Sequence, residues 1–503
     1  MFITAKPPCC CPLYHAHQIK AWEGRWFDSG NSSYGLMQQA ALLMSEHIKT
    51  LINAHSLATP TILVWCGTGN NGGDGYLIAH YLNQHGFNVA IYAPKPPTSV
   101  DATSAKTKAT PIIIDHLDTH ALIDALGALP NVHIDALFGS GLDREVSLDY
   151  QHLFNTFNQK TGLKIAIDVP SGLHPDTGCP LPVAIQADYT LCVMGLKLGL
   201  YINKGRHYAG QVIEIPLIPS DDKLTPFAHL NTHLPALPPK AAYAHKGDFG
   251  HVLIIGGHAT MGGAVIMSAE AAIASGAGKV TVMCHKTHHH AILSRSPNIM
   301  VKDIEDCHQA DFITYLEQID SVAFGMGLGR DTWGQAVFER LFDVLEHTTL
   351  PVVMDADALY WLAQSNKAPL PSTWVCTPHH AEAARLLSVS TTAIGCDVTA
   401  AIFELYRHYG ANWVLKGAGS LSLEPNHTYP PILYVCAFGN QGMATAGMGD
   451  VLSGMIAALI HLNLSLADCV ALHALAGDHL AKQGMYGINA YQMPDAIRYI
   501  INS

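Results

Sequence analysis

Short apolar runs rich in valine and isoleucine recur along the whole chain, and helical patterns such as 262–274 and 381–387 separate them. The first half contains the runs 61–66, 88–93, 132–138, 164–169, 189–194 and 211–215, and the second half contains 251–255, 279–284, 321–324, 351–354, 374–376 and 412–415. Continuous apolar strands of this kind suit parallel sheets that are covered on both faces. The pattern therefore predicts an α/β fold with two doubly wound domains.

A proline-rich segment separates the two halves. Between Ile215 and Gly247 stand Pro216, Pro219, Pro226, Pro235, Pro238 and Pro239. Proline at this density opposes both helices and central strands. We therefore expect residues 1–218 and 241–503 to form two domains of ordinary size, with 219–240 as the linker.

Composition excludes several classes of function. The chain has 503 residues, 49% of them apolar and 14% charged, which fits buried globular domains. Lysine and arginine are scattered and the net charge is −12, so nucleic acid is not expected as a partner. The longest apolar runs fall short of the ~18 residues of a membrane span, and the start is a poor secretory signal. The expected location is cytoplasmic, with no membrane partner.

The most informative segment is 440–454, where small residues and three glycines lead to Asp450 and an apolar helical run. Glycine lets backbone N–H groups face a ligand, and a helix start adds unpaired donors and a positive dipole end. Together these features predict a phosphate site. Asp450 at its mouth could serve as a base toward a hydroxyl group that meets the phosphate.

Three expected strand ends in the first half carry polar groups. The run 61–66 leads to a loop, 67–75, that contains two asparagines and Asp74, with a helix expected from about Tyr76. Asp135 and Asp168 lie in the next relevant runs, and an acid inside an apolar strand is unfavourable unless it is paired or bound. The loop could be a plain polar turn, but three such ends can converge at one crevice.

The second half has polar strand ends as well. Glycine-rich or polar segments follow its runs at 325–329, 355–359, 377–382 and 416–420. Lys416 and the small residues after it can bring a cation to a nucleotide phosphate. Asp355 could bind a metal, although a helix cap or a structural network is favoured. His379 is expected at a helix start, either as a ligand-binding residue or as a cap.

The first half resembles the YjeF N-terminal family, the NAD(P)H-hydrate epimerases, through the 70–74 loop, Asp135, 139–145, 166–172 and 196–200. The resemblance implies a Rossmann-like fold that binds hydrated NAD(P)H beside K⁺. It implies that K⁺ is bound by Asn71, Asp135 and Ser171. It implies substrate contacts by Asn70, Asn71, Gly72, Gly73, Asp74, Gly139, Ser140, Gly141, Leu142, Asp143, Arg144, Glu145 and Asp168. Asp168 would be the catalytic acid/base, with Lys197 either assisting or merely a surface cation.

The second half resembles the YjeF C-terminal family, the ADP-dependent NAD(P)H-hydrate dehydratases of the ribokinase-like superfamily, through 354–359, 377–379, 416–420 and 442–454. The resemblance implies that ADP, with Mg²⁺, is bound by Lys416, Gly417, Ala418, Gly419, Ser420 and Gly449. The hydrated dinucleotide would contact Ala264, Gly327, His379 and the catalytic Asp450. ADP would phosphorylate the hydrate's hydroxyl group, giving NAD(P)H, AMP and phosphate.

Together the resemblances imply a two-step repair enzyme, and two alternatives stand beside it. Its first domain would interconvert the R and S hydrates and its second would dehydrate the S form; a homo-oligomer is expected. One alternative is a small-molecule kinase on the same scaffold, acting on a vitamin or sugar alcohol. The other is a first domain that only binds nucleotide. Lys416–Ser420 and 377–379 argue against the kinase, and the retained Asp135 and Asp168 argue against an inactive first domain.

Overall fold

The computed structural model describes residues 10–233, 235–426, 429–462 and 464–503. By its internal contacts the chain divides into two compact units, Pro12–Ala228 and His229–Ser503, the second also including Cys10 and Cys11. No helix in the described part of the chain is long and apolar enough to cross a membrane.

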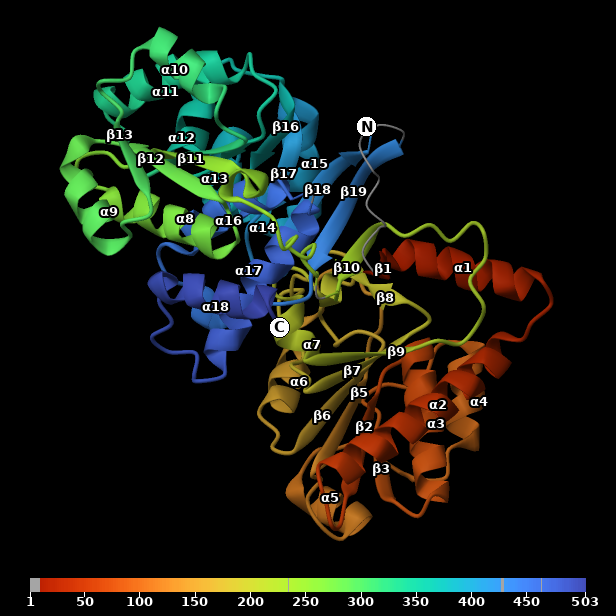
Figure 1. The fold of residues 1–503 in the computed structure, drawn as a ribbon. Helices are drawn as coiled ribbons and strands as arrows, with labels where there is room; N and C mark the ends of the chain where they lie inside the picture. The colour runs from red at the N-terminus through yellow and green to blue at the C-terminus, as the bar shows by residue number, and fades with distance from the viewer. Residues whose placement is uncertain (1–9, 234, 427–428, 463) are drawn as a thin grey trace. The chain divides into compact units, whose positions relative to one another are not determined.

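The first unit is built on a parallel sheet with the strand order β4-β3-β2-β5-β6-β7-β9 (Figure 1). These strands are β2 (Thr61–Cys66), β3 (Asn88–Tyr92), β4 (Ile112–Ile114), β5 (Val132–Ala136), β6 (Leu163–Ile167), β7 (Tyr189–Val193) and β9 (Gln211–Ile215). All neighbouring pairs in it run parallel. The predicted parallel sheet is confirmed, and every apolar run of the first half corresponds to one of its strands.

Helices cover both faces of this sheet. The helices of this unit are α1 (Ala16–Asp28), α2 (Ser33–Ala54), α3 (Asn70–Gln84), α4 (Val100–Lys108), α5 (Thr119–Leu126), α6 (Leu148–Asn158) and α7 (Gly205–Ala209); α2, α3 and α4 pack on one face and α5 and α6 on the other. Alternate residues of β2 point to opposite faces, as the strand period requires. Ile62 and Val64 belong to the core beneath α2 and α3, whereas Leu63 and Trp65 belong to the core beneath α5 and α6. The first unit is thus doubly wound.

The helix after β2 begins earlier than its sequence suggested. α3 starts at Asn70 with Gly69 as its N-cap, six residues before the expected start at Tyr76. The reason is close packing of the helix on the sheet: a Cβ on Gly75 would lie 2.6 Å from the Cβ of Ala136. The glycines of this segment therefore belong to the helix, and Asn70–Asp74 form its first turns.

The second unit contains a larger, mixed sheet with the order β13-β12-β11-β14-β15-β16-β17-β18-β19-β10. The strands are β10 (Ala228–Asn231), β11 (His251–Gly256), β12 (Lys279–Cys284), β13 (Met300–Asp303), β14 (Ser321–Met326), β15 (Val352–Met354), β16 (Leu370–Cys376), β17 (Gly410–Leu415), β18 (Leu421–Asn426) and β19 (Tyr429–Cys436). The pairs from β13 to β17 run parallel, but β17–β18 and β18–β19 are antiparallel. The sequence patterns did not identify β13, β18 or β19.

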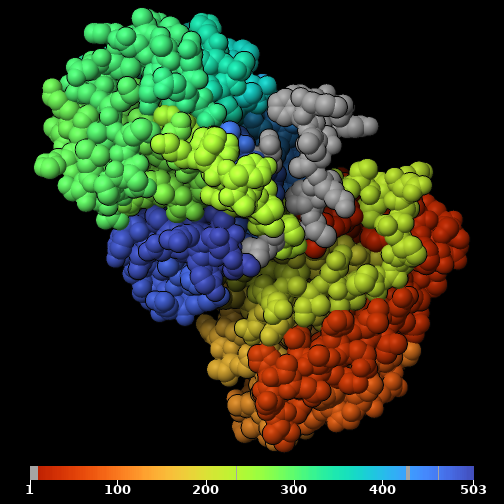
Figure 2. Space-filling model, in the orientation of Figure 1, coloured from red at the N-terminus to blue at the C-terminus, as the bar shows by residue number. Residues whose placement is uncertain are grey.

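Helices cover both faces of the second sheet as well. They are α8 (Gly262–Ala274), α9 (His289–Arg295), α10 (Gln309–Leu316), α11 (Thr332–Leu345), α12 (Asp357–Leu362), α13 (His380–Leu386), α14 (Thr391–Cys396), α15 (Val398–Tyr409), α16 (Met448–Ile460), α17 (Leu466–Ala481) and α18 (Met493–Ile501). On one face, β11 packs with α8, α16, α17 and α18. On the other, Phe324 of β14 stacks on Phe338 of α11 at 5.8 Å between ring centroids. The C-terminal residues, blue in Figure 2, form part of this unit's outer surface.

The proline-rich segment contains one strand. β10 lies between Pro226 and Pro235 and pairs in parallel with β19, with Leu230 opposite Val435. The prolines flank the strand and do not interrupt its ladder. In the first unit, β1 (Cys10–Tyr14) pairs with β8 (Leu196–Lys197), placing Tyr14 opposite Lys197.

Candidate active sites

A buried ion pair lies at the carboxyl edge of the first sheet. Asp168 directly follows β6, and its Oδ1 lies 2.6 Å from the ammonium of Lys197, which is fully buried. That ammonium also donates to the carbonyl of Val193 at 2.6 Å. Burial alone would raise the pKa of Asp168, but Lys197 outweighs it and the pKa is lowered. The surface-cation alternative for Lys197 is therefore wrong: Lys197 is the buried partner of Asp168.

The backbone at Asp168 is strained. Its φ is +67°, a left-handed conformation that residues other than glycine adopt at a free-energy cost. Its second carboxylate oxygen accepts a hydrogen bond from the Ser140 N–H at 2.8 Å. Interactions from two segments thus fix the carboxylate in one orientation.

Asn71 and Gly139 join Asp168 at this edge. A Cβ on Gly139 would lie 2.8 Å from Asp168 Oδ2 and 3.1 Å from Asn71 Oδ1, so glycine allows the three residues to meet. The side-chain N–H₂ of Asn71 is shielded from solvent and forms no hydrogen bond within the described residues. A shielded donor of this kind can be satisfied by a ligand or by an ordered water molecule.

Asp135 and Ser171 form a second buried pair beside the first. Asp135 accepts hydrogen bonds from Ser171 N (2.8 Å), Ser171 Oγ (2.6 Å) and Leu137 N (3.1 Å). Burial raises the pKa of Asp135 to about 6 even though these hydrogen bonds lower it. The structure therefore brings two of the three predicted metal ligands, Asp135 and Ser171, together in a cluster of oxygen atoms where a cation would relieve the burial of charge.

Two further acids surround the Asp168–Lys197 pair. Burial, followed by the charges of Asp168 and Glu23, raises the pKa of Asp74 well above its ordinary value. Burial and the charge of Asp168 also raise the pKa of Glu23. Asp74 was a predicted site residue, but Glu23 was not. It lies on α1, far away in sequence, and no local motif marks it.

The other predicted residues of the first site differ in what they can offer. Asn70 Oδ1 accepts a hydrogen bond from Ser99 Oγ at 2.6 Å. Asp143, Arg144 and Glu145 are exposed, whereas Leu142 is buried in the core. Leu142 could therefore meet a ligand only through its backbone. The remaining members lie in the first turns of α3 or in the loop after β5: Gly72, Gly73 and Gly141.

Asp450 lies in the first turn of α16, in the second unit. The helix begins after Gly447, whose φ of +91° requires glycine. Burial and then the charge of Asp355 raise the pKa of Asp450 to about 7, although Lys416 partly opposes them. The carboxyl group is thus poised to gain or lose a proton near neutral pH.

Lys416 links the loop 416–420 to α16. Its ammonium lies 2.7 Å from Asp355 Oδ1 and 3.9 Å from Glu382 Oε2, and a Cβ on Gly449 would lie 3.1 Å from it. Ser453 Oγ donates to the other oxygen of Asp355 at 2.7 Å. Asp355 therefore belongs to a structural network rather than to a helix cap. Burial raises the pKa of Glu382 to about 7, and neither Glu382 nor Ser453 was identified from the sequence.

His379 caps α13 through one ring nitrogen. Its Nδ1 accepts hydrogen bonds from Ala381 N and Glu382 N at 3.1 and 3.3 Å. Its backbone also forms a parallel bridge with Lys416. The capping alternative is thus observed for Nδ1, which leaves Nε2 as the nitrogen that could meet a ligand.

The remaining predicted groups of the second site also come together. A Cβ on Gly327, whose φ is +60°, would lie 3.3 Å from the Cβ of Ala264. In the loop 416–420, Gly417 N donates to Ser420 Oγ at 3.3 Å, and Gly419 adopts a φ of +69°. Ala418, between them, is exposed. The loop is a compact turn held by its own serine.

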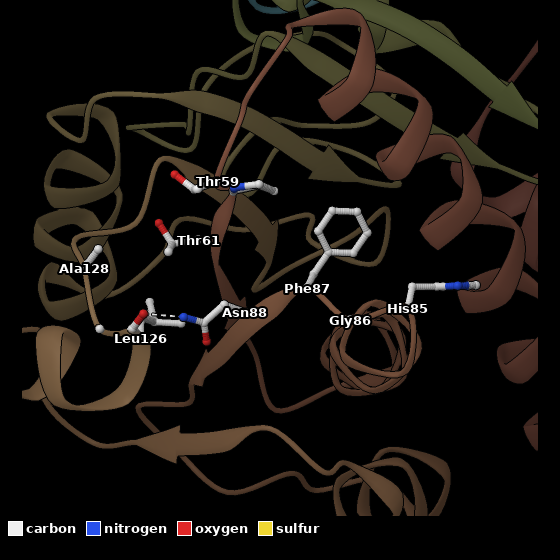
Figure 3. A pocket seen from close by; sticks show the side chains of 10 residues that line it. Thr59, Thr61, His85, Gly86, Phe87, Asn88, Leu126 and Ala128 are labelled. Carbon is white, nitrogen blue, oxygen red and sulfur yellow. Dashed lines mark hydrogen bonds between the residues drawn. The ribbon is translucent and has the colours of Figure 1, made fainter.

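A hollow of about 510 Å³ lies at the opposite end of the first sheet (Figure 3). Thr61 and Asn88, the first residues of β2 and β3, line it together with Phe87. Ligands of doubly wound folds bind beyond the carboxyl ends of strands. This hollow lies at the amino ends, away from the polar clusters.

Comparisons with known proteins match both units. A family model described as NAD(P)H-hydrate dehydratase matches residues 252–501, and one described as YjeF-related protein N-terminus matches residues 33–199. The bifunctional NAD(P)H-hydrate repair enzyme of Coxiella burnetii is 36% identical over 97% of this chain and 99% of its own. That of Escherichia coli is 35% identical over 88% and 85%. A solved ADP/ATP-dependent NAD(P)H-hydrate dehydratase from Bacillus subtilis is 22% identical and covers 53% of this chain and 94% of its own, with a TM-score of 0.46.

The similarity to the curated relatives spans both units, in the same order along the chain. The match to the Coxiella burnetii protein leaves almost no part of either chain uncovered. Each polar cluster at a sheet edge also falls within one of the two matched regions or directly beside it. The chain belongs to the family of bifunctional NAD(P)H-hydrate repair enzymes, in which an epimerase domain is joined to a dehydratase domain.

Proposed function

We propose that Asp450 is the catalytic base of the dehydratase step and that ADP is its co-substrate. The supporting observation is a carboxyl group with a pKa near 7 at the start of α16, with Lys416 beside it. A base is most effective when its pKa lies near the working pH. The amides of the first turn and the Lys416 ammonium would stabilise charge on a phosphoryl group.

The reaction turns a poor leaving group into a good one. Asp450 takes the proton of the hydroxyl group on C6 of the S hydrate, and the oxygen attacks the terminal phosphorus of ADP. The bond between that phosphorus and the bridging oxygen breaks, and AMP leaves. The ring nitrogen then expels phosphate from C6, and a proton leaves C5 to restore the ring double bond. The products are NAD(P)H, AMP and phosphate.

Lys416 would exchange partners when the nucleotide binds. In the protein alone its ammonium is paired with Asp355 and lies near Glu382. Charge on ADP would compete for it, because a phosphate is also a strong acceptor for an ammonium. The other proposed nucleotide contacts are Gly417, Ala418, Gly419, Ser420 and Gly449. Ala264, Gly327 and His379 would contact the hydrated dinucleotide.

The first unit would carry out acid/base chemistry at C6 of either hydrate. Asp168, held ionised by Lys197, would take the proton of the C6 hydroxyl group while the bond between C6 and the ring nitrogen opens to an aldehyde. It would return that proton when the nitrogen closes on the other face of the carbonyl group. Burial raises the pKa of Asp74 well above its ordinary value, and in its protonated form this group could donate a hydrogen bond to the substrate. Asn70, Asn71, the glycines beside them and the 139–145 loop would hold the dinucleotide.

Two cations fit the sites to different degrees. Asp135 and Ser171 form a buried, oxygen-rich pair in which the pKa of Asp135 is raised to about 6, and together with Asn71 they would hold K⁺. A bound K⁺ supplies positive charge beside the dinucleotide. In the second unit Asp355 is paired with Lys416 and Asp357 with Arg330. Mg²⁺ would therefore be held mainly by ADP phosphates and water, as is common for this ion.

The organisation of the enzyme is also part of the proposal. Residues 1–218 and 241–503 would act as the epimerase and dehydratase domains, joined by 219–240. A homo-oligomer in the cytoplasm, without nucleic acid or membrane partners, is the expected working form. Light scattering on the purified protein measures its mass, and a monomer would remove the oligomer from this proposal.

The experiment that tests this function supplies the purified enzyme with ADP, Mg²⁺ and a mixture of R and S hydrates. Recovery of the absorbance of reduced nicotinamide, together with release of AMP and phosphate, supports the proposal. Phosphorylation of a vitamin or sugar alcohol from ATP, without any use of the hydrates, would support the kinase instead.

A further inference from the structure

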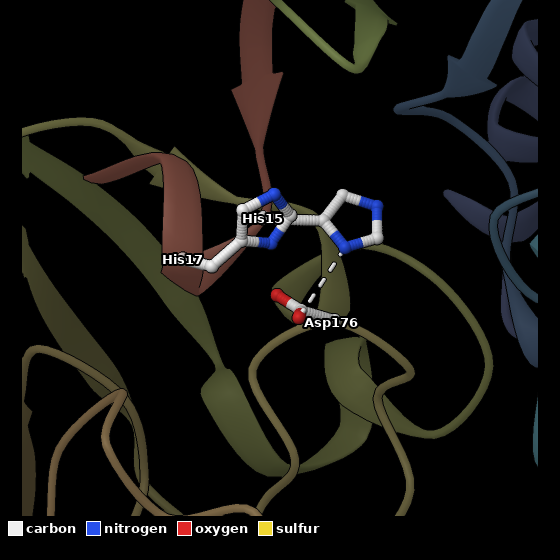
Figure 4. Close-up of side chains that lie close together, drawn as sticks. All are labelled: His15, His17 and Asp176. Carbon is white, nitrogen blue, oxygen red and sulfur yellow. Dashed lines mark ion pairs between the residues drawn. The ribbon is translucent and has the colours of Figure 1, made fainter. Parts of the chain in front are cut away.

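A compact group of metal-ligating side chains lies in the first unit and shares no residue with the Asp168–Lys197 and Asp135–Ser171 clusters. We propose that His15, His17 and Asp176 form a binding site for a divalent transition-metal ion of the zinc class. One nitrogen of each histidine and one oxygen of Asp176 all lie within 4.8 Å of one another. Figure 4 shows both imidazole rings beside the carboxylate, with the His15 nitrogen directed at it.

The chain holds this group in place from two sides. His15 is the N-cap of α1, and His17 lies in the first turn of the same helix. The carboxylate of Asp176 accepts a hydrogen bond from Ala16 N at 2.7 Å. The His15 ring also contacts Phe227 edge-on at 3.9 Å between centroids. The donors are thus oriented before any ion binds, which reduces the entropy lost on binding.

The spacing of the donors suits a tetrahedral ion. His15 Nδ1 and Asp176 Oδ2 are 3.3 Å apart, which is long for a charge-assisted hydrogen bond of about 2.7–2.9 Å. Metal–ligand distances of about 2.0–2.1 Å at a tetrahedral angle place two ligands about 3.3 Å apart. This pair therefore has the separation of two ligands of one ion, and one ring nitrogen of His17 lies within 4.8 Å of a ligand atom of each.

The chemistry of the donors selects the type of ion. Two imidazoles and one carboxylate are ligands for Zn²⁺, Co²⁺, Ni²⁺ or Fe²⁺ rather than for Mg²⁺ or Ca²⁺, which prefer oxygen alone. His17 is exposed, so the ion can enter and a water molecule can fill the fourth position.

The site would connect α1 with the loop that carries Asp176. In that loop the carbonyl of Pro175 accepts a hydrogen bond from Gly199 N at 2.7 Å, two residues after Lys197. A bound ion would therefore tie the start of α1 to the segment that follows the buried lysine. We expect it to stabilise the folded first unit in proportion to its binding.

Metal binding by the full-length, chelator-treated enzyme tests this proposal. Zn²⁺ is titrated by calorimetry, and Co²⁺ is followed by its visible spectrum, for wild type, His17→Ala and Asp176→Asn. The chain has 30 histidines, so His47→Ala, which removes an exposed histidine from α2, is the matched control. Circular dichroism checks that each variant is folded, and His17, being exposed, is a safe position to change.

The wild type and His47→Ala should each bind one ion per chain, with the same affinity. His17→Ala and Asp176→Asn should each weaken it by at least about 10-fold, since even outer partners of ligands change affinity by about 10–100-fold. The wild type should also show a tetrahedral Co²⁺ spectrum and a higher melting temperature with Zn²⁺, and both should be absent in the two site variants. Equal stoichiometry, affinity and spectra in all four proteins would overturn the proposal and leave His15–Asp176 as a simple ion pair.

Discussion

The two units of this repair enzyme each place a carboxyl group at a sheet edge, but in opposite electrostatic surroundings. Asp168 lies 2.6 Å from a fully buried ammonium, and its pKa is lowered. Asp450 lies among Asp355, Asp357 and Glu382, and its pKa is raised to about 7 despite Lys416. Similar locations in similar folds therefore give one acid, Asp168, that is ionised near neutral pH and another, Asp450, that titrates there.

The difference between the two pKa shifts follows from which groups each lysine ammonium contacts. Lys197 is enclosed between Asp168 and the carbonyl of Val193, so its charge acts on Asp168 directly. Lys416 is shared by Asp355 and Glu382, and Asp450 receives only part of its effect. A dedicated lysine keeps an acid charged, whereas a shared lysine leaves a neighbouring acid free to take up a proton.

The largest expected effect is on the dehydratase step. Asp450→Asn should lower kcat/KM for the S hydrate by about 10²–10⁴, the usual contribution of a catalytic base. Steady-state kinetics with ADP measures it, and epimerisation should be unchanged. Asp495→Asn, an exposed acid in the first turn of α18, is the matched control. A loss shared equally by both variants would show that Asp450 has no special role.

Removal of the dedicated lysine should affect stability. Lys197→Met leaves Asp168 buried without its cation, and breaking a buried pair in this way costs about 3–5 kcal/mol. Denaturant unfolding measures the change. Adding Asp168→Asn should recover part of the loss, because the uncompensated charge is then gone. A double variant less stable than Lys197→Met alone would contradict this account.

The pH dependence separates the two sites. Asp450 acts as a base only when ionised, so kcat/KM for dehydration should rise with pH through about 7 and then level off. The pKa of Asp168 lies below its ordinary value, so this residue should add no inflection to epimerisation near neutrality. Rates of each step across pH 5–9 provide the check, and matching profiles would remove the electrostatic contrast between the sites.

A smaller effect should follow from Glu382→Gln. The charge of Glu382 contributes to the raised pKa of Asp450, so its removal should move the dehydration profile toward lower pH. Ser453→Ala, which removes one hydrogen bond to Asp355, should cost about 0.5–1.5 kcal/mol of stability and leave the profile in place. A shift toward higher pH in Glu382→Gln would mean that its hold on Lys416 outweighs its repulsion of Asp450.

The sequence predicted most of the parallel strands but little of the ion-pair and hydrogen-bond networks around the site acids. The runs 61–66 and 279–284 match strands residue for residue, because a buried parallel strand is apolar along most of its length. The run 211–215 also matches a strand, β9, at the edge of the first sheet. β18 and β19 were missed, since antiparallel strands need not carry a continuous apolar pattern, and residues 421–424 alternate apolar and polar side chains. The start of α3 was missed because its glycines indicate a loop locally, whereas they serve close packing on β5.

Site residues show the same limit. Asp168 and Asp450 stand out locally, as an acid at the end of an apolar run and an acid after a glycine loop. Glu23 and Glu382 acquire their roles only through neighbours that are distant in sequence, so no spacing reveals them. Burial decided the interpretation of Lys197, and burial is a property of the folded chain.

The most direct test of two chemically distinct sites uses one mixture of R and S hydrates with ADP and Mg²⁺, followed by the absorbance of reduced nicotinamide. Wild type should recover both epimers. Asp168→Asn should recover the S portion rapidly and then slow sharply, and Asp450→Asn should recover almost nothing while still interconverting the epimers. Recovery of both epimers by Asp450→Asn at the wild-type rate would contradict the account.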